Sequence, residues 1–319
     1  MAEVGCAGIL VADTFCGPMR ALPVPGQLLA VDAMPTRVGG CAANVAIGLA
    51  RQGVSADVVG CVGRDPAAEV PLTELRRHGV GCTQIVRDER LPTSTTVVLL
   101  VEGDDRRFIH CFGANAAFTI GHIRRDWIER LKVFYLGGLF VMPGIATGEL
   151  AALLEFCRRA GVVTVVDVVV PHGFGQQRDL QALLPLIDWF LPNDDEARIF
   201  TGKAEPLDQL AALLAAGANT VVITCGRHGA VAGRGEARWR CGAFAMPTLD
   251  PSGAGDAFDA GVIAGIVKGW EMPRLLRFAA ALGASAVRAI GTTPGVFDAA
   301  EAQAFLDAQP NHVETWIGR

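Results

Sequence analysis

The chain has 319 residues, of which 51% are hydrophobic and 19% charged, and its formal net charge at pH 7 is -5. A chain of this size can bury a large core, as one α/β domain or two smaller ones. The acidic balance lacks the basic excess that binding to a phosphate backbone requires, so we expect no nucleic-acid partner. The N-terminus has no signal-peptide pattern, and apolar runs are broken by charges, Gly or Pro, so we expect no membrane association.

The nine cysteines are odd in number, form no CxxC pair and lie mostly in apolar, strand-like contexts. This usage is typical of buried thiols in a reducing compartment. We therefore expect a cytoplasmic protein.

Short β-branched runs alternate with Ala/Leu-rich segments of helical period, as expected when crossover helices link parallel strands. In chain order, the expected strands are Gly5–Val11, Ala56–Val62, Val133–Leu139, Val162–Val168, Trp189–Leu191 and Thr220–Thr224. The expected helices are Ala42–Gln52, Ala67–His78, Gly148–Ala160, Leu207–Ala216, Ala254–Lys268, Met272–Arg288 and Ala299–Asp307. This order predicts an α/β fold with a doubly wound, mainly parallel sheet flanked by helices.

Two stretches, residues 15–37 and 93–112, interrupt the alternation. The first is rich in Pro and Gly, and the second places two strand-like runs on either side of a turn at residues 102–105, which predicts a hairpin. Strands inserted early in an α/β chain without partner helices can form a small β lid over a ligand site. The sequence shows no repeats or flexible linkers, so we expect residues 1–319 to form a single domain.

The segment from Asp250 to Gly261 runs from a loop directly into an Ala/Gly-rich helix. Gly253, Ala254 and Gly255 allow a ligand to approach the backbone at a helix N-terminus, where free N–H groups attract anions. Asp256 follows in the first turn, where a carboxylate can take a proton from an attacking hydroxyl. On spacing alone, a structural role in helix packing explains these residues equally well.

The same segment resembles the second signature of the ribokinase-like (PfkB) carbohydrate kinases, with Pro251 and Ser252 in place of two threonines. Three further elements resemble the same family and stand in its order. They are Gly39-Gly40-Cys-Ala-Ala-Asn44, the NxxE element Asn193-Asp-Asp-Glu196 and the TxGxxG loop Thr224-Cys-Gly226-Arg-His-Gly229.

The resemblance implies an ATP-dependent kinase that phosphorylates a hydroxyl of a sugar or a similar small molecule. By the same resemblance, Asp256 is the general base and the amides of residues 253–255 form the anion hole. The implied acceptor site is Asp13, Gly39, Gly40 and Asn44; the implied ATP site is Thr224, Gly226 and Gly229; Asn193 and Glu196 organise Mg²⁺, mostly through water. The family also leaves room for a monovalent cation and for a homodimer formed through the lid.

The acceptor stays open between a sugar, a sugar acid, a sugar phosphate and a nucleoside. Cys41 stands where ribokinases proper often carry Lys, which puts a ribose-type acceptor in doubt. Arg106 and Arg107 could reach an acceptor phosphate or form a solvated strand end. The segment Gly113-Ala-Asn115 could return the lid to the core or be a plain turn, and Phe15, Phe108 and Phe112 could stack on a base or form the apolar face of the hairpin.

Rival enzyme classes lack their signatures. The sequence contains no GxxxxGK[ST] loop, no GxGxxG after the first strand and no GxSxG elbow, which excludes a P-loop kinase, a Rossmann dehydrogenase and a nucleophile-elbow hydrolase. A regulatory protein that binds sugar or nucleotide and has lost catalysis remains an alternative, because a fold alone does not confer activity.

Overall fold

The computed structural model describes residues 2–171, 177–310 and 313–317 and contains a nine-stranded main sheet. Six neighbouring strands of this sheet are parallel, and three antiparallel strands extend it on one side. In sheet order the strands are β4 (Ala56–Val59), β1 (Val4–Gly8), β9 (Val133–Gly137), β10 (Val163–Val166), β11 (Trp189–Phe190), β12 (Thr220–Thr224), β13 (Ala230–Arg234), β14 (Ala237–Cys241) and β15 (Val313–Ile317).

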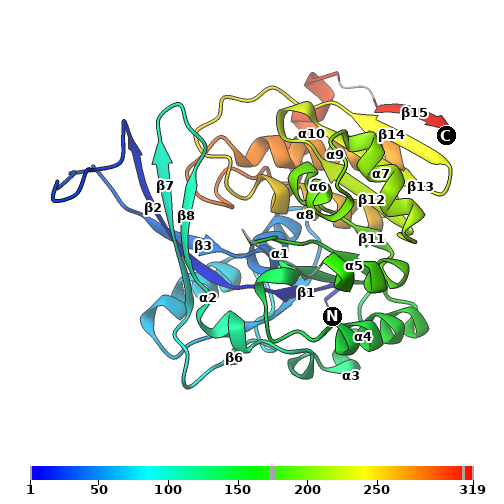
Figure 1. The fold of residues 1–319 in the computed structure, drawn as a ribbon, viewed down its shortest axis with the longest axis horizontal. Helices are drawn as coiled ribbons and strands as arrows, with labels where there is room; N and C mark the ends of the chain where they lie inside the picture. The colour runs from blue at the N-terminus through cyan, green and yellow to red at the C-terminus, as the bar shows by residue number, and fades with distance from the viewer. Residues whose placement is uncertain (1, 172–176, 311–312, 318–319) are drawn as a thin grey trace.

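Helices cover both faces of this sheet (Figure 1). One buried cluster packs α1 (Cys41–Arg51), α2 (Glu69–Arg77), α8 (Ala254–Val267), α9 (Met272–Ala286) and α10 (Ala299–Ala308) on one face. A second cluster packs α3 (Arg125–Ile128), α4 (Thr147–Ala160), α5 (Gln177–Leu183), α6 (Asp194–Thr201) and α7 (Pro206–Ala215) on the other. Successive strand residues alternate between the two clusters, as in Phe134 and Tyr135, because side chains of a strand point to opposite faces. The doubly wound fold is therefore confirmed.

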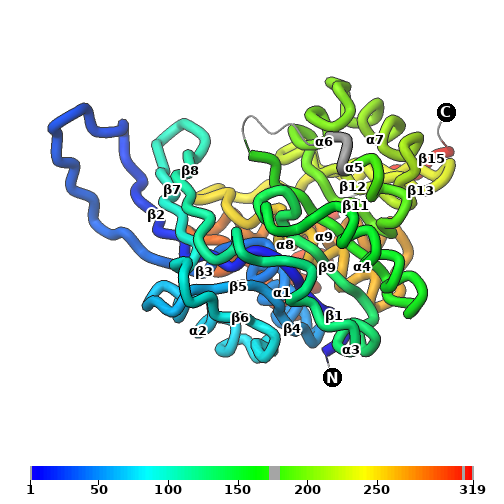
Figure 2. Tube along the Cα trace, turned by 60° about the horizontal axis from the view of Figure 1, so that its bottom comes forward, coloured from blue at the N-terminus to red at the C-terminus, as the bar shows by residue number. Residues whose placement is uncertain are grey.

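A second sheet of four strands lies at the end of the molecule opposite β13–β15 (Figure 1). Its strands, in sheet order, are β3 (Thr36–Gly39), β2 (Val11–Met19), β7 (Ser94–Val101) and β8 (Arg107–Cys111). The predicted hairpin is thus β7 and β8, and the Pro/Gly-rich stretch is largely the loop from β2 to β3, which extends away from the body (Figure 2). A further pair, β5 (Cys61–Val62) and β6 (Val86–Arg87), forms a two-stranded sheet.

Two strand predictions need correction. The expected first strand, Gly5–Val11, is broken: β1 ends at Gly8, and the chain re-enters a different sheet at Val11. Asn115 stabilises this break, because its side-chain amide accepts a hydrogen bond from Leu10 N at 3.2 Å and donates one to Leu10 O at 3.1 Å. The expected strand Ala56–Val62 likewise divides into β4 and β5.

Candidate active site

The loop before α8 presents backbone donors without partners. Gly253 is the N-cap, with φ of 78°, and a Cβ on it would overlap the carbonyl oxygen of Thr292. In the described part of the chain, the amides of Gly253, Gly255 and Asp256 make no backbone hydrogen bond, whereas the Ala254 amide donates to Pro251 O at 3.3 Å. A Cβ on Gly255 would meet open space. This helix start can therefore receive an anion.

Asp256 is held from across the fold. Asn44, a buried residue of α1, donates from Nδ2 to Asp256 Oδ2 at 2.8 Å. The Thr292 hydroxyl lies 2.8 Å from Asn44 Oδ1 and 2.7 Å from Val38 O, so its single proton is shared between two acceptors. The Asn44 amide is fixed by these contacts, and it in turn fixes the Asp256 carboxylate.

Further carboxylates and a thiol lie beside Asp256. Ligand atoms of Cys41, Asp167 and Asp256 all lie within 4.8 Å of one another. Asp259, one helical turn after Asp256, accepts a hydrogen bond from the Tyr135 hydroxyl at 3.2 Å. Burial, aided by the mutual repulsion of the carboxylates, raises the pKa values of Asp167 and Asp259 well above the usual range.

The pKa of Asp256 is also raised by burial, while hydrogen bonds from Asn44 and Cys41 act to lower it. Cys41 keeps its proton, because burial and the negative charge of Asp256 raise the thiol pKa well above its ordinary value. The centre of the candidate site is therefore a carboxylate with a neutral thiol and an amide as its hydrogen-bond donors.

The predicted acceptor residues meet at the junction of the two sheets. Asp13 is only 8% exposed and lies on β2, a strand of the four-stranded sheet. A Cβ on Gly39 would overlap the Asp13 carboxylate, and Gly40, the N-cap of α1, has φ of 91°. Burial raises the pKa of Asp13 to about 6, and repulsion from Asp256 adds to this against a hydrogen bond from Thr96.

The predicted nucleotide residues lie at the carboxyl ends of β11 and β12. Thr224 N donates to Pro192 O at 3.1 Å, and Thr224 forms a parallel bridge with Asn193. Gly226 and Gly229 both have positive φ, at 52° and 89°. The NxxE element and the TxGxxG loop, separate in sequence, are thus neighbours at the edge where open α/β sheets bind ligands.

Asn193 and Glu196 form a capping box at the start of α6. Asn193 Oδ1 accepts from Glu196 N and Glu196 Oε2 accepts from Asn193 N, both at 2.9 Å. Burial raises the pKa of Glu196 to about 7, although the bond from the Asn193 backbone lowers it. The negative charge of Glu196 also raises the pKa of Asp167, which places the two carboxylates in one electrostatic environment.

Carboxylate oxygens fit magnesium better than the Cys41 thiol does. Mg²⁺ takes oxygen ligands and keeps several waters, whereas a thiol is a soft ligand that suits zinc or copper. Asp167 and Glu196 supply carboxylate oxygens; the helix cap uses the one side-chain oxygen of Asn193 but only one of the two carboxylate oxygens of Glu196. Asp167 and Glu196 are therefore the residues that suit a hydrated Mg²⁺.

Sequence reasoning missed four residues of this site: Asp167, Asp259, Tyr135 and Thr292. For Asp167 a signal existed, because it is the one charged residue in a run of valines at the carboxyl end of an expected strand. Asp259 could also have been found from the sequence, because it lies one turn beyond Asp256 on the same expected helix. Tyr135 and Thr292 carry no local signal, since their contacts are made only by the folded chain.

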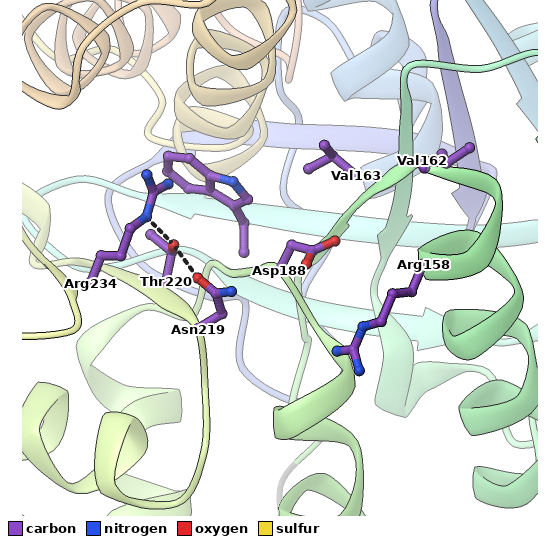
Figure 3. A pocket seen from close by; sticks show the side chains of 9 residues that line it. Arg158, Val162, Val163, Asp188, Asn219, Thr220 and Arg234 are labelled. Atoms are coloured by element: carbon purple, nitrogen blue, oxygen red, sulfur yellow. Dashed lines mark hydrogen bonds between the residues drawn. The ribbon is translucent and has the colours of Figure 1, made fainter.

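A separate concavity of about 350 Å³ opens at the amino ends of the main-sheet strands, where β10, β11 and β12 begin (Figure 3). Its polar side chains are engaged locally: Arg234 donates to the Thr220 hydroxyl at 2.7 Å, and Asp188 accepts from Thr164 N and Oγ1 at 2.9 Å. The candidate site lies at the carboxyl ends of the same strands, so this concavity takes no part in the candidate site.

Known proteins of one family resemble this chain. Residues 1–298 match the pfkB family carbohydrate kinases. The chain is 28% identical to the 2-dehydro-3-deoxygluconokinase of Bacillus subtilis, over 89% of this chain and 91% of that one. It is 26% identical to the ATP-dependent 6-phosphofructokinase of Thermoanaerobacterium thermosaccharolyticum, over 79% and 80%.

The fold resembles the structure of Arabidopsis thaliana ribokinase complexed with ribose and ATP. The TM-score is 0.80, with 24% identity over 96% of this chain and 99% of that one. Among the described residues no helix has the length and apolar character of a membrane span. With the family match over residues 1–298, the chain belongs to the pfkB family of carbohydrate kinases and is a sugar kinase.

Proposed function

We propose that this kinase transfers the γ-phosphoryl group of ATP to a hydroxyl of its acceptor, with Asp256 as the general base. The observation that carries the proposal is the placement of Asp256 directly after the unpartnered amides of the α8 start, with its carboxylate fixed by Asn44. The amides of Gly253, Gly255 and Asp256 then stabilise the transferring oxygens. Ala254 contributes through its small size more than through its amide.

The two substrates approach from the two sides of Asp256. Asp13 accepts hydrogen bonds from acceptor hydroxyls, and Gly39 and Gly40 leave room for them. Thr224, Gly226 and Gly229 line the ATP side. Asp167 and Glu196 hold hydrated Mg²⁺, which supplies charge neutralisation for the ATP phosphates, and Asn193 positions Glu196 through the helix cap.

The base is tested with Asp256→Asn, which keeps the shape and the hydrogen bond from Asn44 but cannot accept the proton. A positioned general base contributes about 10² to 10⁴ in rate, so kcat should fall by that factor while ATP and acceptor still bind. Asp208→Asn, an exposed change on α7, is the matched control and should keep parental kcat. An Asp256→Asn enzyme with more than about half of parental kcat removes Asp256 from this role.

Four finer predictions concern the nucleoside acceptor, a monovalent cation, the domain organisation and the oligomeric state. The nucleoside alternative loses one stacking candidate, because Phe15 is fully buried against Val98 and Leu100. The monovalent cation is tested by comparing turnover in K⁺ and Na⁺ salts. Treating residues 1–319 as one domain with a lid predicts a single unfolding transition, and dimerisation through the four-stranded sheet predicts twice the monomer mass in sedimentation.

A further inference from the structure

A row of polar side chains crosses the four-stranded sheet. Arg37 on β3 pairs with Asp13 on β2, and Asp13 pairs with Thr96 on β7. Thr96 in turn pairs with His110 on β8. Residues directly opposite each other on neighbouring strands point to the same face, with Cβ atoms about 4.5–5.5 Å apart. The row therefore presents a guanidinium, a carboxylate, a hydroxyl and an imidazole in line.

This row faces the candidate site. Asp13 lies against Gly39 and is close enough to Asp256 for their repulsion to raise the pKa of Asp13. Arg37, which stands opposite Asp13, lies against another part of the site. Its Cγ is 3.3 Å from the position that a Cβ on Gly291 would take. Gly291 precedes Thr292, whose hydroxyl contacts Asn44. Arg37 thus lies between the four-stranded sheet and the loop that helps to fix the catalytic carboxylate.

The four side chains of the row differ in their hydrogen-bond and ion-pair partners. Thr96 Oγ1 lies 3.0 Å from His110 Nδ1, and Thr96 stands directly opposite Asp13 on the neighbouring strand. Partial burial lowers the pKa of His110. Arg37, by contrast, takes part in none of the ion pairs or side-chain hydrogen bonds found among the described residues. Its guanidinium is therefore free to bind a ligand.

We propose that Arg37 binds an anionic group of the acceptor, so that the acceptor is a sugar acid or a sugar phosphate instead of a neutral sugar. The proposal rests on the function proposed above. A guanidinium forms paired hydrogen bonds with a carboxylate or phosphate, and neighbouring strands lie about 4.8 Å apart. An acceptor whose hydroxyls bind Asp13 therefore brings its anionic end to Arg37.

The two arginines of the β7–β8 hairpin do not compete for this role. Arg106 pairs with Asp105 at 3.3 Å, and Arg107 pairs with Asp104. Arg107 stands three residues from His110 on β8, so it points to the opposite face of the sheet. Both guanidiniums are engaged in the turn, which leaves Arg37 as the unpaired cation beside Asp13 among the residues that the structure describes.

The test compares matched acceptors that differ only in the anionic group. One pair, which tests a carboxylate, is 2-keto-3-deoxygluconate and 3-deoxyfructose. The other pair, which tests a phosphate, is fructose 6-phosphate and fructose. The parent enzyme should prefer the anionic member of at least one pair. Arg37→Gln should lower kcat/KM for that compound about tenfold to a hundredfold, mainly through KM, and change the neutral member less than about threefold.

Arg107→Gln, on the outer face of the same sheet, is the matched control and should change neither value. Calorimetric binding of each compound to the parent and to Arg37→Gln gives a readout that does not depend on turnover. Equal preference for neutral and anionic acceptors, or equal losses for both in Arg37→Gln, overturns this proposal and leaves the kinase function standing. Anion binding that Arg37→Gln abolishes, in a chain that phosphorylates no acceptor, supports this proposal and overturns the proposed function.

Discussion

Gly253 and Gly255 are two residues apart, yet the structure predicts opposite effects when each is changed to Ala. Gly253 has a left-handed φ of 78°, and a Cβ there overlaps the Thr292 carbonyl oxygen. A left-handed conformation costs a non-glycine residue about 1–2 kcal/mol, and relieving the overlap costs more. Gly253→Ala should therefore lower the free energy of unfolding by at least about 1–2 kcal/mol.

Gly255 is the second residue of α8, and a Cβ on it meets no atom within 4 Å. Replacing a helical Gly with Ala gains about 0.5–1 kcal/mol, so Gly255→Ala should be as stable as the parent or slightly more stable. The added methyl group nevertheless occupies the open space beside the Gly255 amide, where we place the phosphoryl oxygens. ATP affinity and kcat should both fall, and Gly255→Val should lose more than Gly255→Ala.

Urea denaturation measures the free energy of unfolding, and calorimetry with a non-hydrolysable ATP analogue measures nucleotide affinity. Gly253→Ala should lose stability and activity together, because the shift that relieves the overlap also moves the Gly253 amide of the proposed anion hole. Gly255→Ala separates function from folding. If it keeps parental kcat and nucleotide affinity, no phosphoryl group lies over these amides and the anion hole is refuted.

Two further predictions concern ionisation and metal. Because the pKa of Asp13 rises from 3.8 to about 6 on folding, its contribution to stability is present below pH 3.8 and is lost as the pH rises to about 6. Asp13→Asn should thus gain up to about 3 kcal/mol relative to the parent between pH 4 and pH 7, and a difference that stays constant with pH in urea denaturation contradicts the raised pKa. Glu196→Gln should preserve the capping box but lower turnover and raise the Mg²⁺ concentration needed for half-maximal rate; an unchanged Mg²⁺ titration removes Glu196 from the metal site.

The parallel core was predictable because its strands and helices carry strong, regular periodicity. The helices α8 and α9 begin at the residues expected from sequence, Ala254 and Met272. The antiparallel strands β13 and β14 were not expected, since they are short and mix Gly and Arg into the apolar pattern, as at Gly233 and Arg238. Periodicity is a weak signal for strands this short.

Most residues of the candidate site could be predicted from the sequence, but the hydrogen bonds between them could not. The family motifs contain Asn44 and Asp256, yet their hydrogen bond joins positions 212 residues apart. The break between β1 and β2 depends in the same way on Asn115, which lies 105 residues from Leu10. Such contacts follow from how the sheets and helices pack, and a single sequence does not display them.

The thiol at position 41 helps to explain why the proposed base, Asp256, has a raised pKa. Proton transfer is most efficient when the pKa of the base lies near the working pH, and burial moves Asp256 in that direction. A lysine ammonium at position 41, as in ribokinases proper, would stabilise the carboxylate by charge and pull its pKa down. Cys41 stays protonated and lowers the pKa of Asp256 only through a neutral hydrogen bond. The proposed base keeps a raised pKa, and in our proposal Arg37 supplies the cation beside the acceptor.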